Sequence, residues 1–157
     1  MFSVGEKIVY PMHGAGIVEA VESRTVGGKN VDYYKVRITN GNITLMIPVN
    51  NHSGVQLRQI ISSDLAQKVI DGFDESKPES DIPWNKRYKH NVDRLKLGTA
   101  ESVAEVLNEL IIREKAHGLS TSDRKMFILT KNILCSELSI ALQKDSAEIF
   151  ESIISKF

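Results

Sequence analysis

The spacing of apolar residues changes near residue 60, and this change constrains the fold more than any other feature of the sequence. Before residue 60, short runs rich in β-branched residues alternate with glycine and asparagine, which is typical of strands joined by tight turns. From residue 62 onward, apolar residues recur every three or four positions, which is typical of amphipathic helices. The 157 residues are therefore expected to form a strand-rich module followed by a helical module.

The first 60 residues contain four predicted strands, with the sequences KIVY, GIVEAVESRTV, VDYYKVRI and ITLMIPV. Residues 27–30 (GGKN) separate the second strand from the third, and residues 40–42 (NGN) separate the third from the fourth. Glycine and asparagine tolerate the positive φ that tight hairpins require. Several short strands at this spacing predict a small antiparallel β-barrel of the SH3 or Tudor type.

The second half of the chain carries signals for several helices. Ser62 and Ser63 are suited to cap a short helix, and residues 74–83 (DESKPESDIP) then form a predicted acidic linker because they contain almost nothing to bury. The next segment, WNKRYKHNVDRLKLG, is a predicted helix that ends at Gly98. Its apolar residues follow the three-and-four spacing of one helical face and are Trp84, Tyr88, Val92 and Leu95.

Capping residues divide the rest of the chain into three further helices. Thr99, Ser120 and Asp145 are predicted to start them, and Gly118 is predicted to end the first. Together these helices predict a compact bundle. The expected fold class is therefore α+β, with a barrel in residues 1–60, a short helix and acidic linker in residues 61–83, and a helical domain in residues 84–157.

The charge of the chain is balanced overall but uneven along the sequence. Twenty basic and twenty acidic side chains cancel, so the net charge predicts no partner. Residues 61–83 carry two basic and six acidic side chains (net −4), whereas residues 84–131 carry ten basic and six acidic ones (net +4). A local basic cluster is what nucleic-acid binding requires. Acids are interspersed on the same helices, however, and charge alone favours a solvated helix face.

The sequence carries no recognisable motif for catalysis or for a metal or cofactor. The histidines are scattered without the spacing of a metal site, at positions 13, 52, 90 and 117. Cys135 lies between leucines on a predicted helix, which favours a buried thiol over a nucleophile. Residues 13–16 (HGAG) lack the ending of a phosphate-binding loop and are expected to form a turn. We therefore predict a protein that is not an enzyme, with no catalytic residue, metal or cofactor.

Composition also bears on where the protein acts. One cysteine cannot form an internal disulfide, and no apolar run approaches the ~20 residues that span a bilayer. The N-terminal sequence MFSVGEKIVYP is strand-like from its start and does not show the basic and then apolar pattern of a signal sequence. A cytoplasmic protein without a membrane partner is expected.

Trp84, the only tryptophan, lies between the acidic linker and a basic run. As a core residue it would pack where the two modules meet, with its N–H bonded to a carbonyl. As a functional residue it would stack on bases or insert into a minor groove, while Lys86, Arg87 and Lys89 hold the phosphates. Composition and spacing are compatible with both interpretations.

Several separated motifs resemble those of the CarD/CdnL family of bacterial transcription regulators. The N-terminal stretch VGEKIVYPMHGAGIVEAVESRTV is similar to the opening of the family, and the hairpin GGKNVDYYKVRI and the strand ITLMIPV continue the match. WNKRYKHNVDRLKLG resembles the family's Trp-x-x-Arg-Tyr-Lys segment, and GLSTSDRKMF resembles its C-terminal helix-opening motif. The similarity extends from about residue 2 to about residue 155, with the motifs in the family's order.

The resemblance implies a Tudor-like domain that binds the β subunit of RNA polymerase and a helical domain that binds promoter DNA upstream of the −10 element. The family tryptophan lies against the minor groove at the upstream edge of the transcription bubble and slows its collapse. Carried onto this chain, Trp84 is that wedge. The implied DNA contacts beside it are Lys86, Arg87 and Lys89, with Lys125 as a weaker candidate.

On the polymerase side, the resemblance implies a contact at Arg24. Many relatives have a second arginine in the fourth strand, where this chain has Met46, so an apolar contact at the sheet edge would replace a charge. The expected function is a monomeric regulator that stabilises the open promoter complex, with slight sequence specificity because the minor-groove code is degenerate. The alternative is a protein-interaction adaptor whose β module binds a partner and whose helices do not bind DNA.

Overall fold

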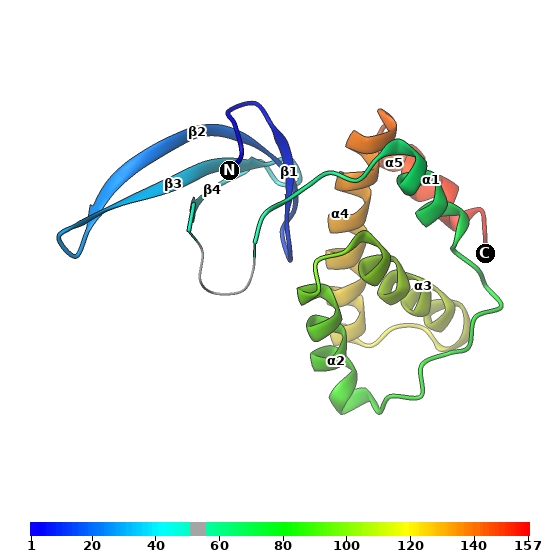
Figure 1. The fold of residues 1–157 in the computed structure, drawn as a ribbon. Helices are drawn as coiled ribbons and strands as arrows, with labels where there is room; N and C mark the ends of the chain where they lie inside the picture. The colour runs from blue at the N-terminus through cyan, green and yellow to red at the C-terminus, as the bar shows by residue number, and fades with distance from the viewer. Residues whose placement is uncertain (51–55) are drawn as a thin grey trace.

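The chain forms two modules, as the sequence predicts, and the α+β class is confirmed (Figure 1). A computed structural model describes residues 1–50 and 56–157, so that His52 lies outside the described residues. The strand-rich module comes first and the helices follow it in a separate group. No helix in these two described ranges is long and apolar enough to cross a membrane.

The N-terminal module is an antiparallel sheet with the strand order β4-β3-β2-β1-β5. Its predicted strands are confirmed as β1 (Lys7–Tyr10), β2 (Gly14–Val26), β3 (Lys29–Ile38) and β4 (Ile43–Pro48). Both predicted hairpin turns are present, and Gly27 and Gly28 adopt the positive φ expected of them. A fifth strand, β5 (Arg58–Gln59), was not predicted, because two residues are too few to show the alternation of apolar and polar side chains that indicates a strand.

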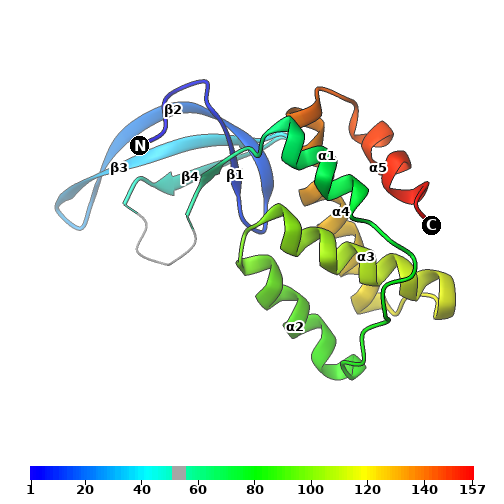
Figure 2. The ribbon, with the colours of Figure 1, turned by 45° about the vertical axis from the view of Figure 1, so that its right-hand side comes forward.

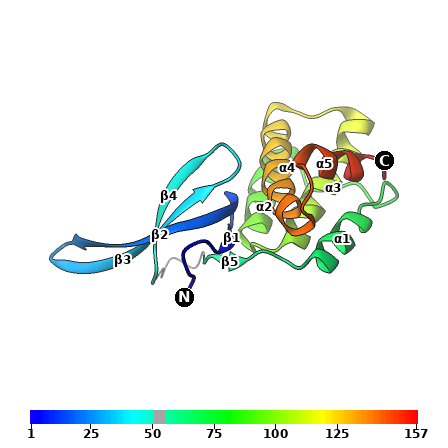
Figure 3. The same ribbon diagram turned by 90° about the horizontal axis from the view of Figure 1, so that it is seen from above.

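One face of the sheet forms the core of this module. Its buried side chains alternate along the strands and include Ile8, Val18, Val36, Ile38 and Ile47. A register shift between Val18 and Ala20 interrupts the pairing of β2 with β3. Beyond this shift the two strands continue as a long hairpin that extends away from the helices (Figures 1 and 3).

The helical module contains α1 (Ser63–Asp71), α2 (Trp84–Lys96), α3 (Ala100–His117), α4 (Thr121–Leu142) and α5 (Ser146–Ile154). Four predicted caps are confirmed, because the side chains of Ser62, Thr99, Ser120 and Asp145 each accept a backbone N–H in the first turn. Gly118 ends α3 with φ of 76°. Local capping chemistry therefore sets these helix boundaries.

The helical core begins earlier in the chain than residue 84. The buried cluster that holds side chains of α3, α4 and α5 also includes Ala66, Val69 and Ile70 of α1 and Phe73, two residues beyond α1. The acidic segment that follows is also attached. The backbone N–H of Asp74 donates to Asn108 Oδ1 (2.9 Å), and Asn108 Nδ2 donates back to the Asp74 carbonyl (3.1 Å). Residues 74–83 therefore run along the helices, as Figure 2 shows.

The two modules meet through a buried ion pair between β5 and α4. Arg58 Nη1 and Nη2 donate to the two carboxylate oxygens of Glu137 (2.6 and 2.7 Å), and Arg58 Nε donates to the Gly98 carbonyl (2.6 Å). The backbone N–H of Ile61 also donates to Glu137 (3.0 Å), whose side chain is only 3% exposed. Both carboxylate oxygens of Glu137 thus accept hydrogen bonds, two of them from the paired N–H groups of one guanidinium. A buried charge needs such partners to offset the loss of its hydration.

The start of β2 also contacts α4. The backbone N–H of Ala15 donates to Ser136 Oγ on α4 (3.0 Å), and that hydroxyl donates to the Ile133 carbonyl (2.7 Å). Gly14, with φ of 97°, approaches so closely that an added Cβ would lie 2.8 Å from Ser136 Oγ. The prediction that HGAG forms a turn is therefore wrong for its last three residues: only His13 lies in the turn, and residues 14–16 begin β2, where Gly14 lets two backbones come close together.

We predict that Glu137→Ala lowers the free energy of unfolding by about 3–5 kcal/mol, because it leaves the Arg58 guanidinium without its buried partner. Urea denaturation of the whole chain measures this change. The matched control is Glu19→Ala, which breaks the half-exposed pair with Arg37 and is expected to cost at most about 1 kcal/mol. Equal losses for the two variants would contradict a structural role for the buried pair.

Candidate nucleic-acid interface

Trp84 is the first residue of α2 and points into solvent. Its side chain is 78% exposed, the largest exposure of any aromatic residue in the described chain. Pro83 occupies the position before it, where a fixed φ suits a helix start. A tryptophan this exposed contributes little to the core, so the core interpretation of Trp84 is wrong.

The buried face of α2 differs from the predicted apolar face. Trp84 and Tyr88 are exposed, whereas the buried residues are Arg87, Asn91 and Leu95, spaced by four. The prediction placed the apolar residues of this helix on one face, and such a face is usually the buried one. Here the buried face is mostly polar, and the aromatic residues remain on the surface.

Two of the predicted bases are exposed in the first two turns of α2. Lys86 and Lys89 are both exposed, and within the described part of the chain the only ion pair of either one joins Lys89 to Asp93 (3.5 Å) in α2. The Lys89 side chain is 85% exposed. An exposed ion pair at this spacing stabilises a helix by only a few tenths of a kcal/mol. Lys89 can therefore exchange Asp93 for a phosphate at little cost. Lys86 and Lys89 are therefore available to an anionic partner.

Arg87 does not belong to this exposed set, and the expectation that it contacts phosphates needs correction. Its side chain is 6% exposed, and Nη1 donates to Asp123 Oδ2 (2.8 Å) in the first turn of α4. Nη2 donates to the Ile82 carbonyl (3.4 Å). While these bonds are made, the guanidinium has no route to a phosphate.

The same ion pair brings the first turn of α4 beside the first turn of α2. Lys125 lies two residues after Asp123 and is exposed. Its neighbour Arg124 pairs instead with Glu114 on α3 (3.2 Å). The structure thus brings Trp84, Lys86, Lys89 and Lys125 to one end of the helical module.

The predicted polymerase contacts share one face of the sheet. Arg24 pairs with Val31, and Met46 pairs with Lys35, which in turn pairs with Ala20. Alternation along the strands places Arg24 and Met46 on the face opposite the core. The two are four positions apart along the strands, roughly 13 Å. Arg24 is 59% exposed and has Glu22 3.4 Å from its guanidinium.

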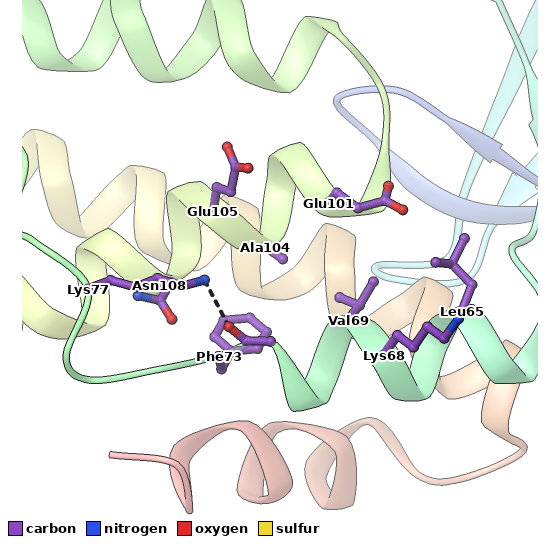
Figure 4. Close-up of a pocket in the computed structure, with 10 residues that line it drawn as sticks. Leu65, Lys68, Val69, Phe73, Lys77, Glu101, Ala104, Glu105 and Asn108 are labelled. Carbon is purple, nitrogen blue, oxygen red and sulfur yellow. Dashed lines mark hydrogen bonds between the residues drawn. The ribbon is translucent and has the colours of Figure 1, made fainter.

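A small apolar pocket lies between the first and third helices. Figure 4 shows an apolar pocket of about 200 Å³ between α1 and α3, smaller than the roughly 300–1,000 Å³ of typical ligand sites. Leu65, Val69, Phe73 and Ala104 line it, and Lys77 at its rim donates to the Gly72 carbonyl (2.8 Å). The residues described in the structure contain no group of three metal-ligating side chains.

A larger hollow of about 680 Å³ lies between the turn at Thr39–Asn40 and helices α4 and α5, and it contains Cys135. Burial raises the pKa of the Cys135 thiol to about 11, and the nearby Lys131 offsets this only in part. The thiolate, which is the nucleophilic form, is therefore scarce at neutral pH.

We predict that Cys135 reacts with iodoacetamide at pH 8 at least about 100-fold more slowly in the folded protein than in urea. A pKa of about 11 leaves about one thiol in a thousand ionised at pH 8, against roughly a quarter for an ordinary cysteine. The rate should rise as the pH approaches 11. Mass spectrometry of the alkylated protein measures it, and similar rates in the two states would contradict the prediction.

Both modules match family models of known proteins. The family model described as "CarD, C-terminal domain" matches residues 68–154, and the one described as "CarD-like/TRCF RID domain" matches residues 2–61. The protein of Bacillus subtilis (strain 168) named "Putative transcription factor YdeB" is 34% identical over 140 residues. That alignment covers 89% of this chain and 92% of the relative.

The two family models and this relative together indicate a transcription regulator with a Tudor-like N-terminal domain and a helical C-terminal domain. Within that class, the chain belongs to the CarD family. The predicted family is thereby confirmed.

Proposed function

We propose that this chain binds the β subunit of RNA polymerase through its sheet and promoter DNA upstream of the −10 element through the first turn of α2. By placing Trp84 in the minor groove, it stabilises the open promoter complex. The observation that carries the proposal is the exposed indole of Trp84 at the start of a helix whose first turns also expose Lys86 and Lys89.

An exposed tryptophan at a helix start suits minor-groove binding. Apolar side chains that enter this groove insert between base steps and hold the duplex in a deformed state. Trp84 projects from the end of a helix, and Tyr88 lies exposed one turn further along. An aromatic group in this position would oppose closure of a partly unwound duplex.

The charges around Trp84 support weak, salt-sensitive DNA binding. Lys86, Lys89 and Lys125 are exposed and offer three phosphate contacts. Each neutralised phosphate contributes about −0.9 to the slope of log K against log salt for duplex DNA. Three contacts give little affinity, so recruitment by the polymerase is required to raise the effective concentration at the promoter.

The arrangement of the modules supports such a bridge. The hairpin of β2 and β3, which carries Arg24, extends from one side of the molecule, and the first turn of α2 lies at the far end of the helices (Figure 1). The outer face of the sheet presents Arg24, Lys35 and Met46. The two proposed contact surfaces therefore do not compete for space.

We predict that Trp84→Ala shortens the lifetime of open complexes by roughly 5- to 150-fold, which corresponds to the ~1–3 kcal/mol of one aromatic–base contact. Because Trp84 is exposed, the free energy of unfolding should change by less than about 0.5 kcal/mol. Competitor-challenged transcription with purified polymerase measures the lifetime. The control, Ile154→Ala, removes an exposed apolar side chain from α5 and should leave the lifetime unchanged. An unchanged lifetime for Trp84→Ala would refute the wedge.

We predict that Arg24→Glu weakens binding to the isolated polymerase β subunit by about 30-fold, the ~2 kcal/mol typical of an important interface arginine. Biolayer interferometry measures the affinity, and Lys7→Glu, an exposed reversal on β1, serves as the control. DNA binding at low salt should be unaffected by either change. If wild-type protein showed no salt-dependent DNA binding at all, the adaptor alternative would replace the proposal.

A further inference from the structure

Arg87 lies within the segment proposed to contact DNA, yet its guanidinium is used inside the protein. Nη1 donates to Asp123 at the start of α4 (2.8 Å), and Nη2 donates to the carbonyl of Ile82 (3.4 Å). Ile82 precedes Pro83, the residue before α2. One side chain thus connects the first turn of α4 to the backbone that leads into Trp84.

Asp123 has a second arginine beside it. Arg113 Nε lies 3.5 Å from the same carboxylate oxygen, and Arg113 Nη1 donates to Glu79 in the acidic segment (3.0 Å). We call Arg87, Asp123, Arg113 and Glu79 the Arg87 network. Its two arginines and two carboxylates balance, so the network holds no surplus positive charge for a phosphate.

The space beside Arg87 also excludes a phosphate. Arg87 Nε–H donates to no partner among the described residues, and Arg87 lines a cavity of about 10 Å³ together with Glu79, Ser80 and Asn91. A cavity of this volume has room for about one water molecule. It is too small to admit a phosphate group.

The first turn of α2 has few restraints other than this network. Pro83 makes no side-chain capping hydrogen bond, and the first turn carries no acidic residue. Of the residues in α2, only Leu95 is both apolar and fully buried, and it lies in the last turn. Apolar packing therefore fixes the C-terminal end of the helix, whereas the N-terminal end depends on Arg87.

We propose that Arg87 is a positioning residue for Trp84. By joining Asp123 to the start of α2, it fixes the direction in which the indole leaves the helix before any DNA is bound. Fixing a group in advance lowers the ordering cost of binding. This inference rests on the proposed contact of Trp84 with DNA, and it replaces the direct phosphate contact expected of Arg87.

The test compares Arg87→Met and Asp123→Asn with Lys86→Gln in the full-length protein. Because Trp84 is the only tryptophan, its fluorescence anisotropy reports the mobility of this one side chain. Positioning predicts that Arg87→Met and Asp123→Asn both lower the anisotropy of the free protein, whereas Lys86→Gln does not. Unchanged anisotropy in both network variants would overturn the inference, whatever their effect on transcription.

Salt dependence separates positioning from phosphate contact. Lys86→Gln should reduce the slope of log K against log salt by about 0.9, because one phosphate contact is lost. Arg87→Met should leave that slope unchanged. A reduction in the Arg87→Met slope as large as that of Lys86→Gln would show a direct contact and would overturn the inference.

The open-complex lifetime of Asp123→Asn distinguishes a positioning role of Arg87 from a phosphate contact. If Arg87 positions Trp84, loss of the carboxylate shortens the open-complex lifetime, as Arg87→Met does. If Arg87 instead contacted phosphate, its release from Asp123 would lengthen the lifetime or leave it the same. In a Trp84→Ala background, positioning further predicts that Arg87→Met has no additional effect.

Folding and the proposed function are controlled separately. Circular dichroism and urea denaturation confirm that each variant is folded, and Asp123→Asn, the milder change, decides the question if Arg87→Met does not fold. Should Trp84→Ala leave the open-complex lifetime unchanged, the proposed function fails. The anisotropy comparison still decides whether Arg87 positions the indole.

Discussion

The buried fork of Arg58 on Glu137 is the interaction on which the arrangement of the two modules depends. It joins the last strand of the sheet to α4, and the same carboxylate accepts the N–H of Ile61 at the start of the helical part. At its other end, α4 holds α2 through Asp123. Glu137 and Asp123 are fourteen residues apart, roughly 21 Å along the helix axis. One straight helix therefore sets the spacing between the sheet and the exposed tryptophan.

Much of this fold follows from local sequence signals. The first four strands, the hairpin glycines and the helix caps were all predicted, because each depends on residues that are close together in sequence. The caps are the side chains of Ser62, Thr99, Ser120 and Asp145. Turn geometry and capping are satisfied within a few residues, whatever the rest of the chain does. The family resemblance added the candidate residues, and the exposure of Trp84 agrees with it.

Other features depend on partners too distant for such rules. The buried face of α2 is mainly polar, and the partner of Arg87 lies 36 residues away, so hydrophobic periodicity did not indicate which face of this helix is buried. In the same way, β5 exists because Arg58 meets a carboxylate 79 residues later. A basic residue within a basic run gives no sign, in sequence alone, of whether it will be exposed or buried.

The separation of Arg58 from Glu137 also has a consequence for the order in which the protein is made. Translation at ~5–20 residues per second needs roughly 4–16 s to cover those 79 residues. During that time the sheet has left the ribosome while its last strand, only two residues long, lacks the carboxylate that holds it. The nascent chain thus relies on its C-terminal helices to complete its N-terminal sheet.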